Sequence, residues 1–224
     1  MQYIQIKESI VEQIEQGLLV PGQKLPSERQ LAESFSTTRV TLREALSILE
    51  TNGLIYREDR RGWFIAFPRI RIPMNDIVEI ASFVPENRFY ANSVLSIQTI
   101  MATKEINALM DLPPFSKVHI VQVLHEIDAR PVALSRYWMK EALTPKLPQA
   151  VEESGCVLNA FQPILALLDK TFSVTVKGLE GDAALKLRAT EGTPGLLVKR
   201  TFRQDDKVEF VEITSWRHDA IELY

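Results

Sequence analysis

The sequence is poor in the side chains that usually bind metals. It has one cysteine and three histidines among 224 residues. The lone Cys156 excludes a disulfide within the chain and a zinc site made of several cysteines, so we interpret it as a core or helix-face residue. No metal-ligand spacing and no nucleophile motif appears either. We therefore expect no metal and no other cofactor.

Long apolar segments are also missing. The chain has no run of about eighteen apolar residues, the minimum for a membrane-spanning helix, and no signal-peptide pattern. Hydrophobic residues make up 46% and charged residues 25% of the chain, which is ordinary for a globular protein. Its length exceeds that of a usual single domain. These features predict a cytoplasmic protein of more than one domain that does not enter a membrane.

A large excess of one charge is absent too, since the formal net charge is −3. Residues 1–71 hold ten Lys/Arg and nine Asp/Glu, whereas residues 72–224 hold sixteen and twenty. Residues 24–71 alone hold nine Lys/Arg and six Asp/Glu. The first part of the chain is therefore slightly basic, and the rest is slightly acidic.

The first informative pattern lies in residues 25–46. Ser27 followed by Gln30 predicts a capping box at the start of a helix. After a polar break, Thr37 or Thr38 can cap a second helix. That helix has a buried stripe with the spacing i, i+3, i+4 and i+7, formed by Leu42, Ala45, Leu46 and Leu49. The segment therefore predicts a helix, a tight turn and a second helix.

The second of these helices presents two cations beside its buried stripe. Arg39 and Arg43 are four residues apart and lie near its N-terminal end, the end that a recognition helix inserts into the major groove of DNA. Asn52-Gly53 ends the helix, because glycine accepts the left-handed conformation without strain. We interpret this helix as a DNA-recognition helix.

Residues on both sides complete the motif. Apolar residues recur every fourth position from Ile6 to Leu18, and Pro21-Gly22 closes that helix. Residues 54–57 and 63–67 predict two strands around a charged turn, which together form a hairpin wing. Its tip, Arg60-Arg61-Gly62, can lay two cations on phosphate while the backbone approaches closely. Three helices and a wing make a winged helix-turn-helix.

The blocks PGQKLPSERQLAESF, TRVTLREAL, LETNGLI and RRGWFI occur in this order between Tyr3 and Ile65. In these blocks the segment resembles the DNA-binding domain of the GntR family of bacterial transcription regulators. The resemblance implies double-stranded operator DNA as the partner, contacted through the arginines and the threonine of these blocks and through the wing. The candidate DNA-binding residues are Ser27, Arg29, Thr38, Arg39, Thr41, Arg43, Arg60, Arg61 and Gly62.

Charged residues in this segment also have a simpler interpretation. A surface arginine is often only a solvated charge, and this alternative stays open for Arg29. Arg57 is interpreted as a surface residue of a wing strand. Glu28 and Glu44 are interpreted as helix partners of nearby arginines.

Beyond Phe67 the pattern changes. Pro68 and Pro73 bracket an extended linker, and residues 76–85 predict a short helix. Alternating residues then predict an antiparallel sheet of five or six strands with helices on it. The expected strands are 94–102, 117–127, 132–139, 172–179, 196–202 and 208–216, and the expected helices are 104–110, 157–168 and 182–189. The fold class is α+β, with domains at 1–69 and 90–224 joined by a linker at 70–89.

The order of these elements, together with the EGTPGLLVKRTF block, resembles the UTRA effector domain of the HutC-type GntR regulators over residues 90–224. That domain has a fold similar to chorismate lyase. The resemblance implies an effector such as a phosphonate, a sugar phosphate or another polar metabolite, bound between the sheet and its covering loops. Two alternating arginines that usually hold an anionic group correspond here to Val123 and His125. One cationic clamp is therefore missing.

The candidate effector-binding residues are polar or aromatic side chains on the expected sheet and its long helix. For each of them, an ordinary position on a hairpin surface or within the sheet remains the alternative. Arg200 and Arg203 are further strand cations that could replace the missing clamp. The candidates are Asn92, Ser93, His125, Arg136, Asn159, Glu212, Trp216 and Arg217.

These patterns favour a ligand-responsive DNA-binding regulator, a repressor that binds a palindromic operator as a homodimer and is released by a small polar or anionic metabolite. One alternative is a DNA-binding protein whose second domain only dimerises and senses no ligand. Another is an enzyme that pairs a histidine with a carboxylate, such as His218 with Asp219. His125 and Glu126 cannot form such a pair, because adjacent residues on a strand point to opposite faces. We expect no enzymatic activity.

Overall fold

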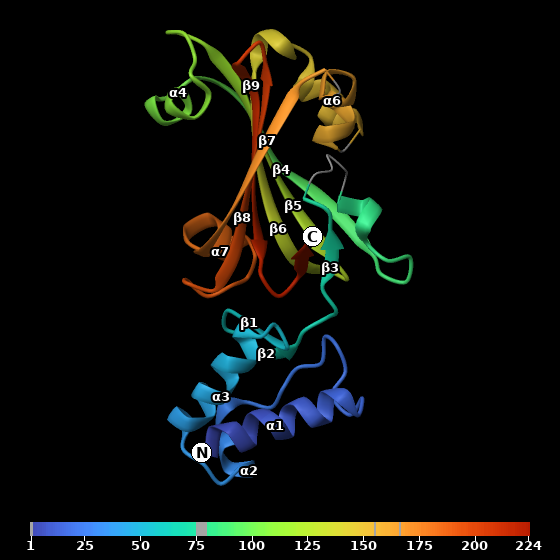
Figure 1. Cartoon of the computed structure of the whole chain (residues 1–224), viewed down its shortest axis with the longest axis vertical. Helices are drawn as coiled ribbons and strands as arrows, with labels where there is room; N and C mark the ends of the chain where they lie inside the picture. Colours follow the sequence, from blue (N-terminus) through green and yellow to red (C-terminus); the bar gives the residue numbers. More distant parts are fainter. Residues whose placement is uncertain (1, 75–79, 155, 166) are drawn as a thin grey trace. The chain divides into compact units, whose positions relative to one another are not determined.

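The computed structural model describes residues 2–74, 80–154, 156–165 and 167–224 (Figure 1). Contacts divide the chain into two units. The first comprises the residues up to Ile72 together with Gly178–Pro194 and Arg217–Tyr224, and the second comprises Pro73–Lys177 and Gly195–Trp216. Within the described ranges, no helix combines the length and the apolar character needed to span a membrane. The domain boundaries at 1–69 and 90–224 stay a prediction, because the two units are defined by packing contacts and not by function.

The first unit contains three helices and a hairpin wing, in the order that the sequence predicts. The helices are α1 (Gln2–Glu15), α2 (Glu28–Ser34) and α3 (Arg39–Thr51). The wing consists of β1 (Ile55–Glu58) and β2 (Gly62–Ile65), which pair in antiparallel fashion. This confirms the winged helix-turn-helix.

The apolar stripes of α1 and α3 form the core of this part. Leu42, Leu46 and Leu49 of α3 are fully buried, as the helical spacing predicts. They pack with Ile6 and Ile10 of α1 in one cluster of buried side chains. Burying a leucine side chain stabilises a fold by roughly 1.5 to 3 kcal/mol. This stripe therefore holds the opposite, polar face of α3 toward solvent.

The predicted extent of α1 is wrong at its C-terminal end. The helix ends at Glu15, and Leu18 is 65% exposed instead of buried. Gly17 adopts a φ of 73°, and the Leu18 amide then donates to the Gln13 carbonyl at 2.9 Å. A left-handed glycine of this kind terminates a helix. The periodic pattern thus continues beyond the point where the backbone turns away.

The first unit also contains three short elements that follow the wing in the sequence, two of them from segments farther along the chain. Residues Ile70–Ile72 of the expected linker form β3, which pairs in parallel with β10 (Ile221–Leu223). The short helix α7 (Gly181–Lys186) is shorter than the expected helix at 182–189. Part of the short helix expected at 76–85 lies outside the described residues. The described part of that range, which belongs to the second unit, contains a 3-10 turn, η1 (Ile80–Phe83).

The second unit is built on an antiparallel sheet of six strands in the order β4-β5-β6-β9-β8-β7. Two-residue turns at Asp128-Ala129 and Asp205-Asp206, with positive φ at each residue, connect its hairpins. The sheet confirms the α+β fold class. Its strands are β4 (Tyr90–Met101), β5 (Lys117–Ile127), β6 (Arg130–Lys140), β7 (Asp169–Gly178), β8 (Pro194–Gln204) and β9 (Lys207–Arg217).

Helices cover both faces of this sheet, and Figure 1 shows α4 and α6 on opposite sides of it. On one face, α4 (Lys104–Met110) packs its Ile106 and Met110 against Val118 and Val211. On the other, α5 (Leu147–Ser154) and α6 (Val157–Leu165) pack over Val121, Val123, Tyr137 and Phe210. A 3-10 turn, η2 (Glu141–Leu143), leads into α5. The second of these faces, here called the covered face, holds most of the polar residues discussed below.

Candidate functional site

The starts of α2 and α3 and the wing line a hollow of about 670 Å³ in the first unit. It contains seven of the residues proposed from the sequence to bind DNA, and Thr38 and Thr41 stand beside Arg39 at the start of α3. Lys24 and Arg57 also line it, although the sequence did not suggest them. The proposed residues in the lining are Ser27, Arg29, Arg39, Arg43, Arg60, Arg61 and Gly62.

Capping residues fix where the two helices begin. The Ser27 hydroxyl accepts from the Gln30 amide, and the Gln30 side chain accepts from the Ser27 amide at 3.0 Å, which completes the predicted capping box. The Thr38 hydroxyl accepts from the Thr41 amide at 3.2 Å. Each cap is worth about 1 kcal/mol. The caps therefore set the position from which Arg29, near the start of α2, projects.

Glu28 of α2 contacts both α3 and the wing. Its carboxylate accepts from Arg43 Nε of α3 at 2.7 Å and from Trp63 Nε1 of the wing at 3.2 Å. Partial burial opposes ionisation, but the hydrogen bonds from Arg43 and Trp63 lower the pKa of Glu28 below its usual value. The sequence suggested a partner within the helix, whereas the structure places that partner on α3.

The other cations of the hollow differ in how far acids neutralise them. Arg29 forms an exposed pair with Glu33 at 3.0 Å, and Arg61 pairs with the buried Glu58. Arg57 lies over the Trp63 ring at 5.6 Å. Arg39 is exposed and forms no ion pair or hydrogen bond with any side chain that the structure describes. Its charge is therefore available to a partner outside the chain.

A second set of polar residues crosses the covered face of the sheet. Tyr90 Oη lies 2.8 Å from His125 Nδ1, and His125 Nε2 lies 2.9 Å from Ser135 Oγ. Ser135 Oγ is 2.7 Å from Thr214 Oγ1, which donates to Glu212 at 2.9 Å. We call this chain of contacts, which runs from β4 to β9, the polar row. Arg200 of β8 donates to Glu212 at 3.1 Å and extends the row by one strand.

The two positions at which the family resemblance implies arginines carry no positive charge. Val123 is buried in the apolar cluster beneath α5 and α6. Burial lowers the pKa of His125 to about 3. The imidazole is therefore neutral at physiological pH. Hydroxyl groups and a neutral ring, rather than a pair of cations, form this end of the covered face.

The pairing register of the strands determines which candidate effector residues lie on the same face of the sheet. Asn92 lies opposite His125, and Trp216 lies opposite Ala133, so both belong to the covered face with Glu212. Ser93 lies opposite Leu124, and Arg136 lies opposite Gln122. Both therefore belong to the other face, and Arg136 does not meet His125. Asn159 is exposed on α6.

The sequence analysis did not select Tyr90, Ser135 and Thr214. The sequence could have indicated them through the alternation of side chains along the strands and the positions of the two hairpin turns, which together fix the strand register. Ser135 faces Thr214 directly across β6 and β9. Once that pairing is known, these three residues follow from their strand positions.

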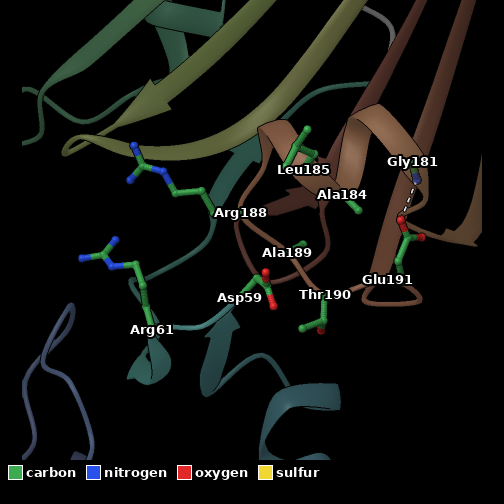
Figure 2. Close-up of a pocket in the computed structure, with 9 residues that line it drawn as sticks. All are labelled: Asp59, Arg61, Gly181, Ala184, Leu185, Arg188, Ala189, Thr190 and Glu191. Atoms are coloured by element: carbon green, nitrogen blue, oxygen red, sulfur yellow. Dashed lines mark hydrogen bonds between the residues drawn. The ribbon is translucent and has the colours of Figure 1, made fainter.

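A smaller hollow, of about 360 Å³, lies between the wing turn and the α7 segment within the first unit (Figure 2). Asp59 and Arg61 of the wing line one part of it, and Arg188, Thr190 and Glu191 line another. The Glu191 carboxylate accepts from the Gly181 amide at 3.0 Å, which closes the loop around α7.

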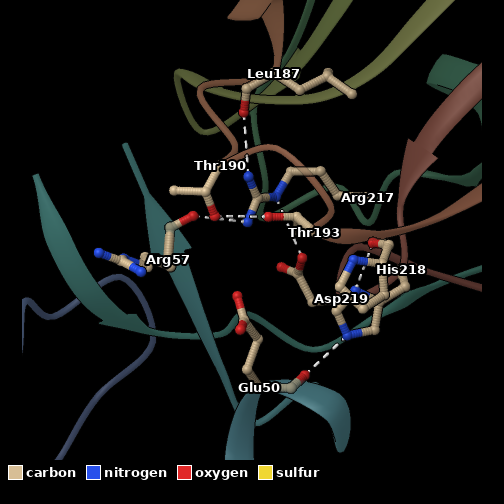
Figure 3. A network of polar contacts seen from close by, with 9 residues as sticks. Glu50, Arg57, Leu187, Thr190, Thr193, Arg217, His218 and Asp219 are labelled. Carbon is tan, nitrogen blue, oxygen red and sulfur yellow. Dashed lines mark hydrogen bonds and ion pairs between the residues drawn. The ribbon is translucent and has the colours of Figure 1, made fainter. Parts of the chain in front are cut away.

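Arg217 belongs to the first unit and not to the polar row, and Figure 3 shows its guanidinium directed toward Asp219 and the backbone of Leu187. It is 1% exposed, and its guanidinium donates to the carbonyl oxygens of Leu187 and Arg57, each at 3.1 Å, and to Asp219 at 3.2 Å. The ring nitrogens of His218 lie 2.8 and 2.9 Å from the carbonyl oxygens of Glu50 and Pro194. Arg217 thus joins the wing strand to the turn after α7.

Glu50 is a second acidic residue of this network, besides Asp219. Burial raises the pKa of its carboxyl, although the nearby charges of Arg217 and His218 oppose the shift. Its backbone carbonyl, one residue before the end of α3, is the group that His218 contacts. The C-terminal end of α3 is therefore held by His218.

Comparisons with known proteins agree with this architecture. The model of bacterial regulatory proteins of the gntR family matches residues 2–65, and the UTRA domain model matches residues 86–222. The HTH-type transcriptional repressor NagR of Bacillus subtilis (strain 168) is 29% identical over 205 residues, which cover 89% of this chain and 83% of that protein. The mannosyl-D-glycerate transport/metabolism system repressor MngR of Escherichia coli (strain K12) is 31% identical over 157 residues, with coverage of 68% and 64%.

A solved structure agrees with the fold. PhnF from Mycobacterium smegmatis aligns with a TM-score of 0.64 at 18% identity, and the alignment covers 98% of this chain and 97% of that chain. This likeness concerns the fold alone. Together with the two family matches it confirms the resemblance predicted from the sequence. The chain belongs to the gntR family of bacterial regulatory proteins and carries a UTRA domain.

Proposed function

We propose that this protein is a ligand-responsive repressor that binds a palindromic operator as a homodimer and is released by a small polar or anionic metabolite. The observation that carries the proposal is the hollow that gathers cations from α2, α3 and the wing. Clustered arginines on a capped recognition helix are the usual means of reading duplex DNA. The names of NagR and MngR support repression rather than activation.

Within this surface the arginines of α3 have different roles. The exposed Arg39 has no acidic partner among the described residues and can form bidentate hydrogen bonds with a guanine edge. Arg43 is oriented by Glu28, which fixes its guanidinium before DNA arrives. Arg60 and Arg61 at the wing tip supply phosphate contacts, and Gly62, with a φ of 100°, gives the tip a turn that other residues rarely adopt.

The effector would bind on the covered face of the sheet, near the polar row. Relatives are named for systems that use mannosyl-D-glycerate and fructoselysine, which are rich in hydroxyl groups. Neutral hydroxyl and imidazole groups suit such a ligand, because each can donate and accept hydrogen bonds. Release requires only that the effector prefer the arrangement that does not bind DNA. A tenfold preference corresponds to about 1.4 kcal/mol.

DNA binding is tested with a duplex from the region upstream of the chain's own gene, measured by fluorescence anisotropy. We expect Arg39→Ala and Arg43→Ala each to weaken binding by about 1 to 3 kcal/mol per lost base contact. Lys7→Ala, which removes a cation of α1 outside the hollow, serves as the matched control and should bind as the wild type does. Unchanged binding by both arginine variants would exclude the recognition-helix assignment.

The effector role is tested by thermal-shift screening of sugar phosphates, phosphonates and neutral glycosides, followed by DNA release. We expect at least one compound to raise the melting temperature and to weaken operator binding. His125→Ala should abolish both effects, since it removes the centre of the polar row. If no compound does both, the alternative of a second domain that only dimerises is favoured.

A further inference from the structure

The turn that follows α7 is bound to the wing by backbone hydrogen bonds. The Asp59 amide donates to the Arg188 carbonyl at 2.9 Å. The buried Arg217 donates to the carbonyl of Leu187 and to that of Arg57 in the wing strand. All of these residues belong to the first unit. None of the three hydrogen bonds uses the side chain of Arg188, which stays available.

Neither packing nor backbone conformation accounts for an arginine at position 188. Its side chain is exposed and, within the part of the chain that the structure describes, makes no hydrogen bond or ion pair. Its φ is +52°, a left-handed conformation in which glycine is less strained. The cation is therefore held at this place without an internal partner.

Arg188 continues the basic surface of the DNA-binding hollow. Arg61 lines that hollow and also lines the smaller hollow with Arg188. Figure 2 shows the guanidinium groups of Arg61 and Arg188 projecting to the same side of the wing. Arg61 pairs with Glu58, whereas Arg188 forms no ion pair among the described side chains. The less neutralised of the two charges thus lies outside the winged helix-turn-helix sequence.

We propose that Arg188 contacts a phosphate of duplex DNA beside the wing, so that the turn after α7 forms part of the DNA-binding surface. The proposal rests on the proposed function, because it requires the wing to lie on DNA. A guanidinium binds phosphate oxygens through two parallel hydrogen bonds. Such a contact adds affinity and salt dependence without reading the base sequence. A small free anion fits less well, because Asp59 and Glu191 also line the smaller hollow.

The experiment measures binding of the full-length protein to the upstream duplex and to a scrambled duplex of equal length at several salt concentrations. We expect Arg188→Ala to weaken binding to both duplexes by about three- to tenfold and to reduce the salt slope by about 0.9. Arg188→Lys should retain the slope. Lys186→Ala, which removes a cation from α7 that lines neither hollow, should bind as the wild type does.

The possible results distinguish a failure of the Arg188 phosphate contact from a failure of the proposed function. If Arg43→Ala weakens binding while Arg188→Ala leaves the affinity and the salt slope unchanged, the phosphate contact is wrong and the regulator assignment stands. If Lys186→Ala lowers the slope as much as Arg188→Ala does, the effect reflects total charge and the contact is again wrong. If Arg39→Ala and Arg43→Ala also have no effect, the proposed function itself fails. Melting temperatures of all variants verify that each one is folded.

Discussion

His125 shows how a titratable residue becomes a neutral hydrogen-bonding group. Its ring is 5% exposed and lies between the hydroxyl groups of Tyr90 and Ser135. Burial lowers its pKa to about 3, so the ring stays unprotonated while a solvent-exposed imidazole would titrate near 6.5. A metabolite that reaches this residue meets a polar surface without a positive charge.

The same burial makes the stability of the fold depend on pH. Between about pH 6.5 and 3 the unfolded chain binds one more proton at His125 than the folded chain does, so acidification favours unfolding. We predict that the free energy of unfolding falls in this range with a contribution of up to about 1.4 kcal/mol per pH unit from this residue. Urea unfolding of His125→Gln from about pH 7 to pH 5 should show a correspondingly smaller slope.

Tyr90→Phe provides the matched control for this measurement. It removes one hydrogen bond from the imidazole but leaves the ring in place. Its stability should therefore decrease at every pH while the dependence on pH stays close to that of the wild type. Equal slopes for the wild type and His125→Gln would contradict the assignment of a buried, neutral histidine.

At the scale of single residues, the sequence predicts local interactions better than it predicts contacts between distant residues. Ser27 and Gln30 form the capping box that their spacing predicts, because a cap is a local interaction. Glu28 was expected to pair within its helix, yet it pairs with Arg43, fifteen residues away. That pairing depends on how α2 packs on α3, and no local pattern encodes this packing. The sequence analysis counted Arg217 among the effector-binding candidates, whereas the packing of distant segments places it beside the wing strand.

Within the part of the chain that the structure describes, the strand β7 is exposed along almost its whole length. It ends the six-stranded sheet, and its side chains are exposed almost throughout. Phe172, Val174 and Val176 alternate along it and are 41%, 38% and 74% exposed. Residues with this spacing share one face of a strand. An exposed edge strand with an apolar face is a ready surface for pairing with another chain.

We predict that a second copy of the chain covers β7 in the proposed homodimer. Val176→Lys places a charge on the apolar face and should raise the dissociation constant of the dimer by at least about tenfold. Thr175→Lys places the same charge on the polar face of the same strand and should leave the dimer intact. Sedimentation velocity over a range of protein concentrations distinguishes the two. Equal dimerisation by both variants would place the interface elsewhere.

Strands and helices were predictable where the pattern is local and strong. The hairpin strands β5 and β6 lie within a residue or two of their expected positions, because alternation and a two-residue turn define them. The strand β3 was expected as linker. Three residues carry too short a pattern to signal a strand, and its partner β10 lies at the far end of the chain.

At the scale of the whole chain, Arg217 and Asp219 form the most deeply buried ion pair of the first unit. They are 1% and 0% exposed, and Arg217 also lies over the Tyr56 ring at 5.4 Å. Removing one partner of a buried pair leaves the other charge without compensation, which typically costs 3 to 5 kcal/mol. This pair therefore stabilises the attachment of the chain's last segment to the wing.

We predict that Arg217→Met lowers the free energy of unfolding by about 3 kcal/mol or more. The double variant Arg217→Met with Asp219→Asn should recover part of this loss, since no uncompensated carboxylate remains. Hydrogen exchange of the Asp59 amide, which donates to Arg188, should become faster in both variants. An exchange rate equal to that of the wild type would show that the turn stays bound to the wing without Arg217.

The pairing of β3 with β10 keeps the DNA-binding head beside the last strand within the first unit. Only residues 66–69 separate the end of β2 from the start of β3. Four residues reach about 14 Å even when fully extended, and the Ala66 amide already donates to Leu54 in the head. The connection between the wing and β3 is therefore short. In the proposed homodimer, this short connection would limit the half-site spacings that the two heads can reach. Inserting flexible residues at 67 or 68 should therefore reduce discrimination between operators before it reduces the affinity for DNA.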